Sequence, residues 1–261
     1  MTMKEITYSI KQRISWRLAI LLLTFINVTS SFAVSKAEAD SAYVDGNYQL
    51  AAQYYNELLE EGVSSELYFN LGNAYYRMND ITHSLIAYER ALRLSPGDTD
   101  IRFNLQLARS KTVDKIAPEA ELFFVTWYHA FVNLLSADGW SFFALGTLAF
   151  AILLALLYLF SSPIWLRKIG FFGGMSMMML FLMANIFAWQ QQSALTSHKD
   201  AIIIQSAVSV KSSPSLGSAD LFLLHEGTKV KITDDSMENW KEIRISDGKQ
   251  GWVEFSQIEI I

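Results

Sequence analysis

Two uninterrupted apolar runs dominate the hydrophobic pattern of the chain, at residues 140–160 and 169–189, and neither contains a charged residue. A helix needs about 20 apolar residues to cross a hydrocarbon layer of about 30 Å, and each run is about that long. The alternative is a helix pair in the core of a soluble protein, but such helices normally carry polar residues along one face. The pattern therefore predicts a transmembrane α-helical hairpin at residues 139–190.

The connection between the two runs indicates the orientation of the hairpin. Residues 161–168 contain Pro163, which is expected to end the first helix, and their only charges are Arg167 and Lys168. Short loops rich in lysine and arginine remain in the cytoplasm. We therefore expect this loop to face the cytoplasm and both flanks of the chain to lie outside.

The start of the chain has the layout of a secretory signal peptide. Four basic side chains lie within residues 4–17, an apolar stretch follows at residues 18–28, and Ser31-Phe32-Ala33 provides a small-x-small cleavage site. The alternative is an uncleaved anchor helix, because the apolar stretch can be extended to membrane-spanning length. Both interpretations of residues 1–34 place the chain that follows outside, in agreement with the orientation of the hairpin.

The segment before the membrane repeats itself with a period typical of paired helices. Phe69-Asn70-Leu71 recurs 34 residues later as Phe103-Asn104-Leu105. A 34-residue period is the tetratricopeptide spacing, and the segment resembles that family most closely around Gly72 and Ser84, which are small where two helices cross at close range. The resemblance predicts a tetratricopeptide repeat domain at residues 35–115, with two repeats and a capping helix.

The same resemblance implies a peptide-binding groove lined by the first helix of each repeat. The candidate protein-binding residues on this face are Asp40, Tyr43, Phe69, Asn70, Asn73, Tyr76, Arg77, Phe103 and Asn104. Asparagine side chains can hydrogen-bond a peptide backbone without demanding one sequence. The alternative is that the phenylalanines pack the repeats together while Asn73 and Arg77 are merely solvated.

A shorter apolar segment bridges the repeats and the hairpin at residues 116–138. Thr126, His129 and Asn133 recur at helical spacing among its aromatic and aliphatic residues, which indicates an amphipathic helix. We expect this helix either to lie in the outer membrane–water interface or to pack under the repeats.

After the hairpin, residues 191–261 change to an alternating pattern with frequent turn signals, which predicts a small barrel of five or six strands. The segment resembles a bacterial SH3 domain, most specifically at Glu226-Gly227 and Gly251-Trp252-Val253. The resemblance implies an aromatic groove for a peptide or for the stem peptide of the cell wall. Its candidate aromatic residues are Phe222, Trp240, Trp252 and Phe255. The alternative is that the two tryptophans, which fall on strands, belong to the core.

Composition narrows the classes of function. The net charge is −5 with no basic stripe, which argues against a nucleic-acid partner. The chain has no cysteine, and this excludes disulfides, thiolate metal sites and a cysteine nucleophile. The four histidines are scattered without metal-ligand spacing. We therefore expect no catalytic residues, no metal and no cofactor, and hence no enzyme.

The complete order of segments predicts a multi-domain membrane protein with α-helical tetratricopeptide repeats, a transmembrane α-hairpin and a small all-β SH3-like barrel. This order resembles the BatE proteins of the Bacteroides aerotolerance operon. That resemblance implies a complex in the inner membrane with von Willebrand A-type membrane proteins and a MoxR-type ATPase, linked to aerotolerance or envelope stress, with the repeats and the barrel in the periplasm. The leading hypothesis is a non-enzymatic scaffold. The alternatives are an envelope sensor that binds peptidoglycan and an accessory subunit of a membrane transporter or an enzyme.

Overall fold

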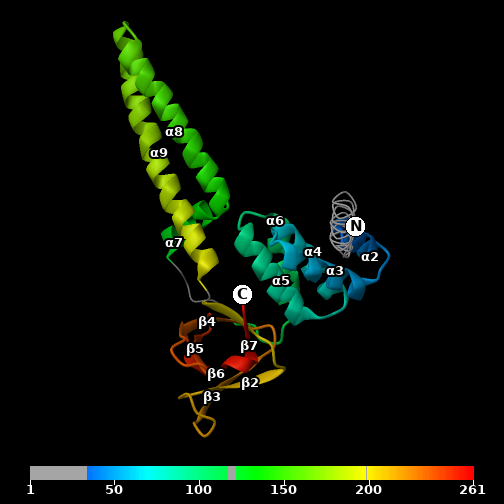
Figure 1. The fold of residues 1–261 in the computed structure, drawn as a ribbon. Helices are drawn as coiled ribbons and strands as arrows, with labels where there is room; N and C mark the ends of the chain where they lie inside the picture. The colour runs from blue at the N-terminus through cyan, green and yellow to red at the C-terminus, as the bar shows by residue number, and fades with distance from the viewer. Residues whose placement is uncertain (1–33, 117–121, 198) are drawn as a thin grey trace, which may run out of the picture. The chain divides into compact units, whose positions relative to one another are not determined.

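The computed structural model describes residues 34–116, 122–197 and 199–261 (Figure 1). The chain divides into two units, residues 1–35 and 36–261, and every helix and strand discussed below belongs to the second. The predicted signal peptide lies outside the described residues apart from its last position, Val34.

Between residues 34 and 116 the structure has five helices, and each of the last four begins at a side chain that caps its first turn. They are α2 (Lys36–Val44), α3 (Tyr48–Glu61), α4 (Ser65–Arg77), α5 (Ile81–Leu94) and α6 (Thr99–Arg109). The capping side chains of Asn47, Ser64, Asp80 and Asp98 accept backbone N–H groups of the helices that follow them. Gly46, with φ of +79°, makes the turn between α2 and α3. Each helix packs on the next, which gives two helix pairs and a closing helix.

Gly72 and Ser84 lie where α4 and α5 cross at close range, as their small size predicts. A Cβ atom on Gly72 would lie 2.6 Å from the ring of Tyr88, and the Ser84 hydroxyl donates to the Gly72 carbonyl at 2.9 Å. Ser84 and Tyr88 are both fully buried. In the second helix pair, the backbone of α4 at Gly72 therefore packs directly against the Tyr88 ring of α5, with no space between the two.

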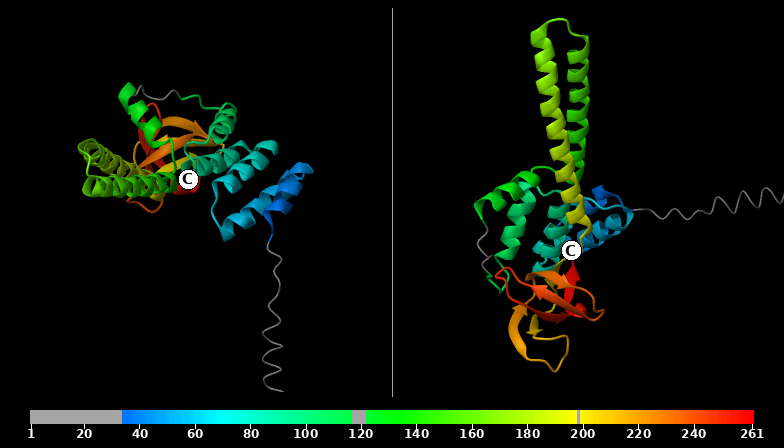
Figure 2. Two further views of the ribbon diagram at one scale, coloured as in Figure 1. Left: turned by 90° about the horizontal axis from the view of Figure 1, so that it is seen from above. Right: turned by 90° about the vertical axis from the view of Figure 1, so that its left-hand side faces the viewer.

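The bridging segment and the hairpin form three helices. α7 (Phe123–Val132) is shorter than the expected segment, and Phe123, Phe124 and Trp127 on it are exposed, so the helix is not packed under the repeats. α8 (Ala137–Phe160) and α9 (Ile164–Thr196) run side by side (Figures 1 and 2) and are long and apolar enough to cross a membrane.

Two features of the hairpin differ from those that the sequence predicts. The loop between its helices is confined to residues 161–163, so Arg167 and Lys168 belong to the start of α9 rather than to a loop. Pro163 caps α9 because its missing N–H group is not needed there. At the other end α9 continues past the predicted limit at residue 190.

The apolar side chains of the hairpin are mostly exposed, which argues against a helix pair in a soluble core. In the most apolar window of α8 only 17% of residues are buried, and in that of α9 only 11%. The helices touch where Gly170 lies against α8, since a Cβ atom there would meet the Leu154 carbonyl oxygen and the Tyr158 backbone at 2.7 Å. Apolar surface of this extent is normally covered by a partner or by lipid.

The chain ends in an antiparallel sheet of seven strands, more than the expected five or six. They are β1 (Asp200–Ile203), β2 (Ala207–Lys211), β3 (Asp220–His225), β4 (Lys229–Asp234), β5 (Trp240–Arg244), β6 (Gln250–Glu254) and β7 (Ile258–Ile260), in the order β3-β2-β6-β5-β4-β1-β7. The alternating run at residues 201–211 is divided into β1 and β2, which pair with different neighbours. A single 3₁₀ turn (Phe255–Gln257) without glycine or proline separates β6 from β7, so no turn signal marked the last strand.

Helix α5 joins the repeats to both other parts of the described chain. Eight of its 14 residues are buried, and Leu85, Ile86 and Tyr88 share a core with Ile202 of β1 and with Ile261. At the edge of this core, Arg90 donates to the Glu259 carboxylate and the Ile260 carbonyl, both at 2.9 Å. The helix therefore packs on α4 through one side and on the sheet through another.

Candidate functional site

The first helices of the repeats bring two of the predicted asparagines into direct contact. Asn73 of α4 accepts hydrogen bonds through its Oδ1 atom from the Tyr88 hydroxyl at 2.7 Å and from the Asn104 amide at 3.1 Å. Both asparagines are half-buried. Among the described residues, neither the Asn73 amide nitrogen nor the Asn104 side-chain oxygen has a hydrogen-bond partner. One donor and one acceptor therefore remain side by side, which is what a peptide group in an extended segment requires.

The aromatic residues predicted for this face have different environments. Phe103, next to Asn104, is 66% exposed, so it contributes little to the packing of the repeats. Phe69 instead packs against the Tyr88 ring with 5.9 Å between centroids. Tyr76 is half-buried beneath the Lys111 ammonium group, 4.1 Å from the ring centroid. Of these three aromatic residues, Phe103 alone has a largely free surface, in the position before Asn104.

Asn70 is used inside the repeats, in a cluster around Asp40. The Asp40 carboxylate accepts from Tyr55 at 2.6 Å and from Asn70 at 3.5 Å, and pairs with Lys36 at 2.8 Å. Partial burial raises the pKa of Asp40, but the hydrogen bonds from Lys36 and Tyr55 outweigh it, so the net pKa lies below the usual range. The carboxylate is therefore charged at neutral pH and holds α2 against α3 and α4.

Arg77 makes its contact with the first repeat. Its guanidinium donates to the Tyr48 hydroxyl at 2.6 Å and lies 5.0 Å from the centroid of that ring, and Tyr43 packs edge-on against Tyr48. The predicted residues are thus dispersed: Asp40 and Asn70 share one cluster, Tyr43 and Arg77 both contact Tyr48, and Asn73 contacts Asn104, while Phe69 and Tyr76 have separate partners.

The aromatic residues predicted for the sheet do not share one groove. Trp252 lies opposite Glu242 and Lys211, and Trp240 lies opposite Glu254, so the register puts both indoles on the face away from the core. Phe222 lies opposite buried Val210 and packs against the core. Both tryptophans are half-buried and stand outside the core cluster, contrary to the alternative that they fill the core. The structure therefore separates Phe222 from the tryptophan pair.

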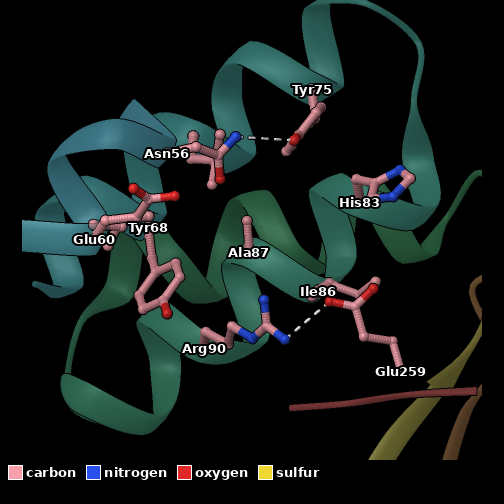
Figure 3. A pocket seen from close by; sticks show the side chains of 11 residues that line it. Asn56, Glu60, Tyr68, Tyr75, His83, Ile86, Ala87, Arg90 and Glu259 are labelled. Atoms are coloured by element: carbon pink, nitrogen blue, oxygen red, sulfur yellow. Dashed lines mark hydrogen bonds and ion pairs between the residues drawn. The ribbon is translucent and has the colours of Figure 1, made fainter. Parts of the chain in front are cut away.

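A pocket on another face of the repeats was not anticipated (Figure 3). It has a volume of about 280 Å³ between α3, α4 and α5, and Glu259 of the sheet closes one side. Its polar groups already bind one another: Asn56 donates to the Tyr75 hydroxyl at 3.2 Å, and Arg90 pairs with Glu259 at 2.9 Å (Figure 3). Because Arg90 and Glu259 lie 169 residues apart, no local pattern could have indicated this pocket. Within the described ranges, no group of three or more His, Cys, Asp or Glu side chains is placed to hold a metal ion.

Comparison with known proteins agrees with two parts of this architecture. Residues 65–98, which contain α4 and α5, match the tetratricopeptide repeat family. Residues 206–257, which contain β2 to β6, match the bacterial SH3 domain family. No curated protein matches the chain. Both families consist of interaction modules, so the matches indicate binding of protein partners and are compatible with binding of peptidoglycan.

Proposed function

We propose that the chain is a non-enzymatic scaffold of the inner membrane that docks partner proteins through its tetratricopeptide groove. The observation that carries the proposal is the Asn73–Asn104 contact, which leaves one amide donor and one acceptor free on the helix that also carries exposed Phe103. These groups suit an extended peptide that carries an apolar side chain. The other polar residues of the face are engaged within the repeats, so the docking site is narrower than the predicted groove.

The contacts at the base of the hairpin support a placement of the repeats and the sheet on the same side of the membrane. Arg93 of α5 donates to the carbonyl groups of Ala194, Leu195 and Ser197 at the end of α9, at 2.5–3.0 Å. The sheet begins directly after this end, at Asp200. Arg167 and Lys168 lie near the opposite end of the hairpin. With that basic end in the cytoplasm, both other modules lie in the periplasm.

The resemblance to the BatE proteins supports a choice of partners. It favours von Willebrand A-type membrane proteins and a MoxR-type ATPase in a complex that serves aerotolerance or resistance to envelope stress. The short loop at residues 161–163 offers little surface to a cytoplasmic protein. A partner anchored in the same membrane is therefore the one that the groove would bind directly.

The test is recovery of that partner from detergent-solubilised membranes. Replacing Asn73 and Asn104 together by alanine should lower recovery of the von Willebrand A-type protein by about fivefold or more, since peptide hydrogen bonds are worth about 0.5–1.5 kcal/mol each and two are lost. Gln106→Ala is the matched control, because this exposed residue is on the same helix as Asn104 but two positions away and on another face. Equal recovery with the double variant and the wild type would exclude the groove as the docking site.

A second candidate function is binding of peptidoglycan by the sheet. The half-buried indoles of Trp240 and Trp252 share the face away from the core, where they can stack on a sugar or a stem peptide. Co-sedimentation with purified peptidoglycan sacculi should then fall when Trp252 is replaced by alanine, while Leu216→Ala, which alters an exposed apolar residue between β2 and β3, should sediment as the wild type does. This candidate would be rejected if neither the wild type nor the variants sedimented with the sacculi.

A further inference from the structure

We infer that the junction between the helical repeats and the sheet holds a second binding site, which takes an acidic peptide segment with apolar neighbours. A cavity of about 730 Å³ lies there, lined by α5, by the segment that follows α6, and by β1, β4 and the end of β5. Pockets for peptides and small ligands usually have volumes of about 300–1,000 Å³. The cavity is separate from the asparagine pair, so this inference goes beyond the proposed function.

The carboxylates that line the cavity already have ion-pair or hydrogen-bond partners. Buried Glu89 is paired with Arg109 through one oxygen and with Lys229, at 3.0 Å, through the other. Lys229 also holds Asp200 at 3.1 Å. Asp114 accepts hydrogen bonds from the backbone N–H of His225 and from the Thr228 hydroxyl, and its other oxygen lies 2.8 Å from the His225 ring. None of these three acids is free to neutralise a further cation.

Three cations of the lining have no such partner. Within the described part of the chain, no carboxylate lies within ion-pair distance of Lys115, Lys231 or Arg244. Lys115 donates only to carbonyl groups at the end of α6 and just beyond it, at 2.7–3.2 Å. The cavity therefore carries an uncompensated positive charge.

Two of these cations occupy an unfavourable arrangement. Lys231 and Arg244 are directly opposite each other on β4 and β5, and both are exposed. Like charges at facing positions of two strands destabilise a sheet. The neighbour of Arg244 on its other side is neutral Gln250, and the neighbour of Lys231 is Asp200, which Lys229 holds. An anion bound across the pair would remove the repulsion.

The rest of the lining distinguishes among anions. Half-buried Ile116 contributes an apolar side chain to the same cavity, and buried Leu85 and Ile202 form its floor. A peptide in which glutamate or aspartate alternates with aliphatic residues satisfies both parts of the lining.

The experiment measures fluorescence anisotropy with the full chain in nanodiscs of zwitterionic lipid. The probe is a fluorescein-labelled hexapeptide of alternating glutamate and leucine, the comparison peptide replaces glutamate with lysine, and empty nanodiscs give the blank. We expect the acidic peptide to bind and the basic one not to bind. Replacing Lys231 and Arg244 together by glutamine should raise the Kd at least tenfold, because each loses a hydrogen bond to a charged group.

The controls separate a binding role from a structural one. Lys249→Gln neutralises an exposed lysine outside the cavity lining and should bind as the wild type does, and Lys231→Arg should retain most of the affinity. The double variant should melt at the same or a higher temperature, since it removes a repulsion. Equal affinity in the double variant, a lower melting temperature in it, or no preference for the acidic peptide would overturn the inference. If Asn73→Ala alone abolished binding of the acidic peptide, the peptide would occupy the groove and the inference would again be overturned. If the cavity variants bound the peptide as the wild type does, the proposal for the groove would be unaffected.

Discussion

Gly72 shows how closely one residue limits the packing of the repeats. Alanine is favoured over glycine within a helix by about 0.5–1 kcal/mol. A methyl group here would nevertheless lie 2.6 Å from the ring of Tyr88, which is buried and is anchored by its hydroxyl to Asn73. Overpacking costs about 1–3 kcal/mol, so the net effect of Gly72→Ala should be a loss of stability. Thermal melts of the full chain in detergent measure it.

The control for this prediction is Gly62→Ala in the same helical unit. Gly62 has an extended backbone, with φ of −173°, and nothing lies within 4 Å of the position of its Cβ atom. Alanine there should be neutral or slightly stabilising. Equal melting temperatures for Gly72→Ala and the wild type would mean that α4 and α5 do not cross at this distance.

Asp114 makes the junction of repeats and sheet sensitive to acid. Burial raises the pKa of this carboxyl, but hydrogen bonds from the Thr228 hydroxyl and from the backbone and ring of His225 outweigh it and hold the pKa below its ordinary value. A lowered pKa stabilises the fold above the unfolded-state pKa of about 3.9, and this contribution disappears as the pH falls through the folded-state value. Asp114→Asn should therefore lower the melting temperature at pH 7, by an amount that shrinks toward pH 3.

Differential scanning fluorimetry of the full chain at both pH values tests this dependence. Asp247 is the matched control, since hydrogen bonds from Lys249 also lower its pKa, but it sits in a turn at the surface of the sheet. Asp247→Asn should leave the melting temperature nearly unchanged at both pH values. A constant deficit in Asp114→Asn from pH 7 to pH 3 would show that the charge of Asp114 does not stabilise the junction.

Among the elements, α7 is held in place by its C-terminal end. The Trp140 indole and the Gln191 amide both donate to the Val132 carbonyl, at 2.8 and 2.9 Å, and Tyr128 donates to Gln190 at 2.5 Å. The helix is thus attached to the base of the hairpin. Phe123, Trp127 and Phe131, four residues apart on one face, are each more than 60% exposed. Aromatic residues beside a membrane-spanning helix favour the lipid headgroup layer.

We therefore predict that α7 lies in the membrane–water interface. Spin labels on single cysteines in nanodiscs should show Trp127→Cys shielded from a water-soluble nickel reagent and Thr126→Cys accessible to it, because the two residues lie about 100° apart on the helix. Leu153→Cys, in the middle of α8, provides the reference for hydrocarbon depth. Equal accessibility at Trp127 and Thr126 would place α7 in water, and accessibility at Leu153 as well would remove the membrane assignment of the hairpin.

The elements that could be predicted are those with a local signal. The repeat period identified the helix pair around Gly72, and the uncharged runs identified α8 and α9, because both signals lie within one or two neighbouring elements. Strand β7 could not be predicted, since its three residues follow β6 without a turn residue and are paired with β1 nearly 60 positions earlier. The orientation of Trp240 and Trp252 likewise depends on strand register rather than on composition.

The candidate groove was predicted as a face but not in its detail. The period assigns Phe103 and Asn104 to it, because they recur 34 residues after Phe69 and Asn70, whereas Asn73 was assigned by the resemblance to tetratricopeptide repeats. Their different roles depend on Tyr88, whose hydroxyl occupies one side of Asn73. The junction with the sheet was missed altogether, because pairs such as Glu89 and Lys229 lie 140 residues apart and leave no periodic trace.

At the scale of the whole molecule, α5 connects the candidate groove to the sheet and to the base of the hairpin. Tyr88 contacts the asparagine pair, Arg90 contacts the sheet, and Arg93 contacts the end of α9, all within two turns of one helix. A peptide bound at Asn73 would thus be connected, through Tyr88, to the helix that contacts the hairpin and the sheet. This arrangement requires the repeats and the sheet to lie on one side of the membrane.

That requirement gives a prediction of topology that the absence of native cysteine makes easy to test. Single cysteines at Gln53 in α3 and at Ser236 after β4 should react with a membrane-impermeant maleimide in intact spheroplasts, because both positions are exposed and belong to the modules that we propose to be periplasmic. A cysteine at Ser162, in the loop between α8 and α9, should react only after the membrane is permeabilised. Ser162 is exposed as well, so its protection in intact cells would come from the membrane and not from the fold. Labelling of Ser162 together with protection of Gln53 and Ser236 would reverse the orientation, whereas labelling of Gln53 with protection of Ser236 would contradict the contacts of α5 with the sheet.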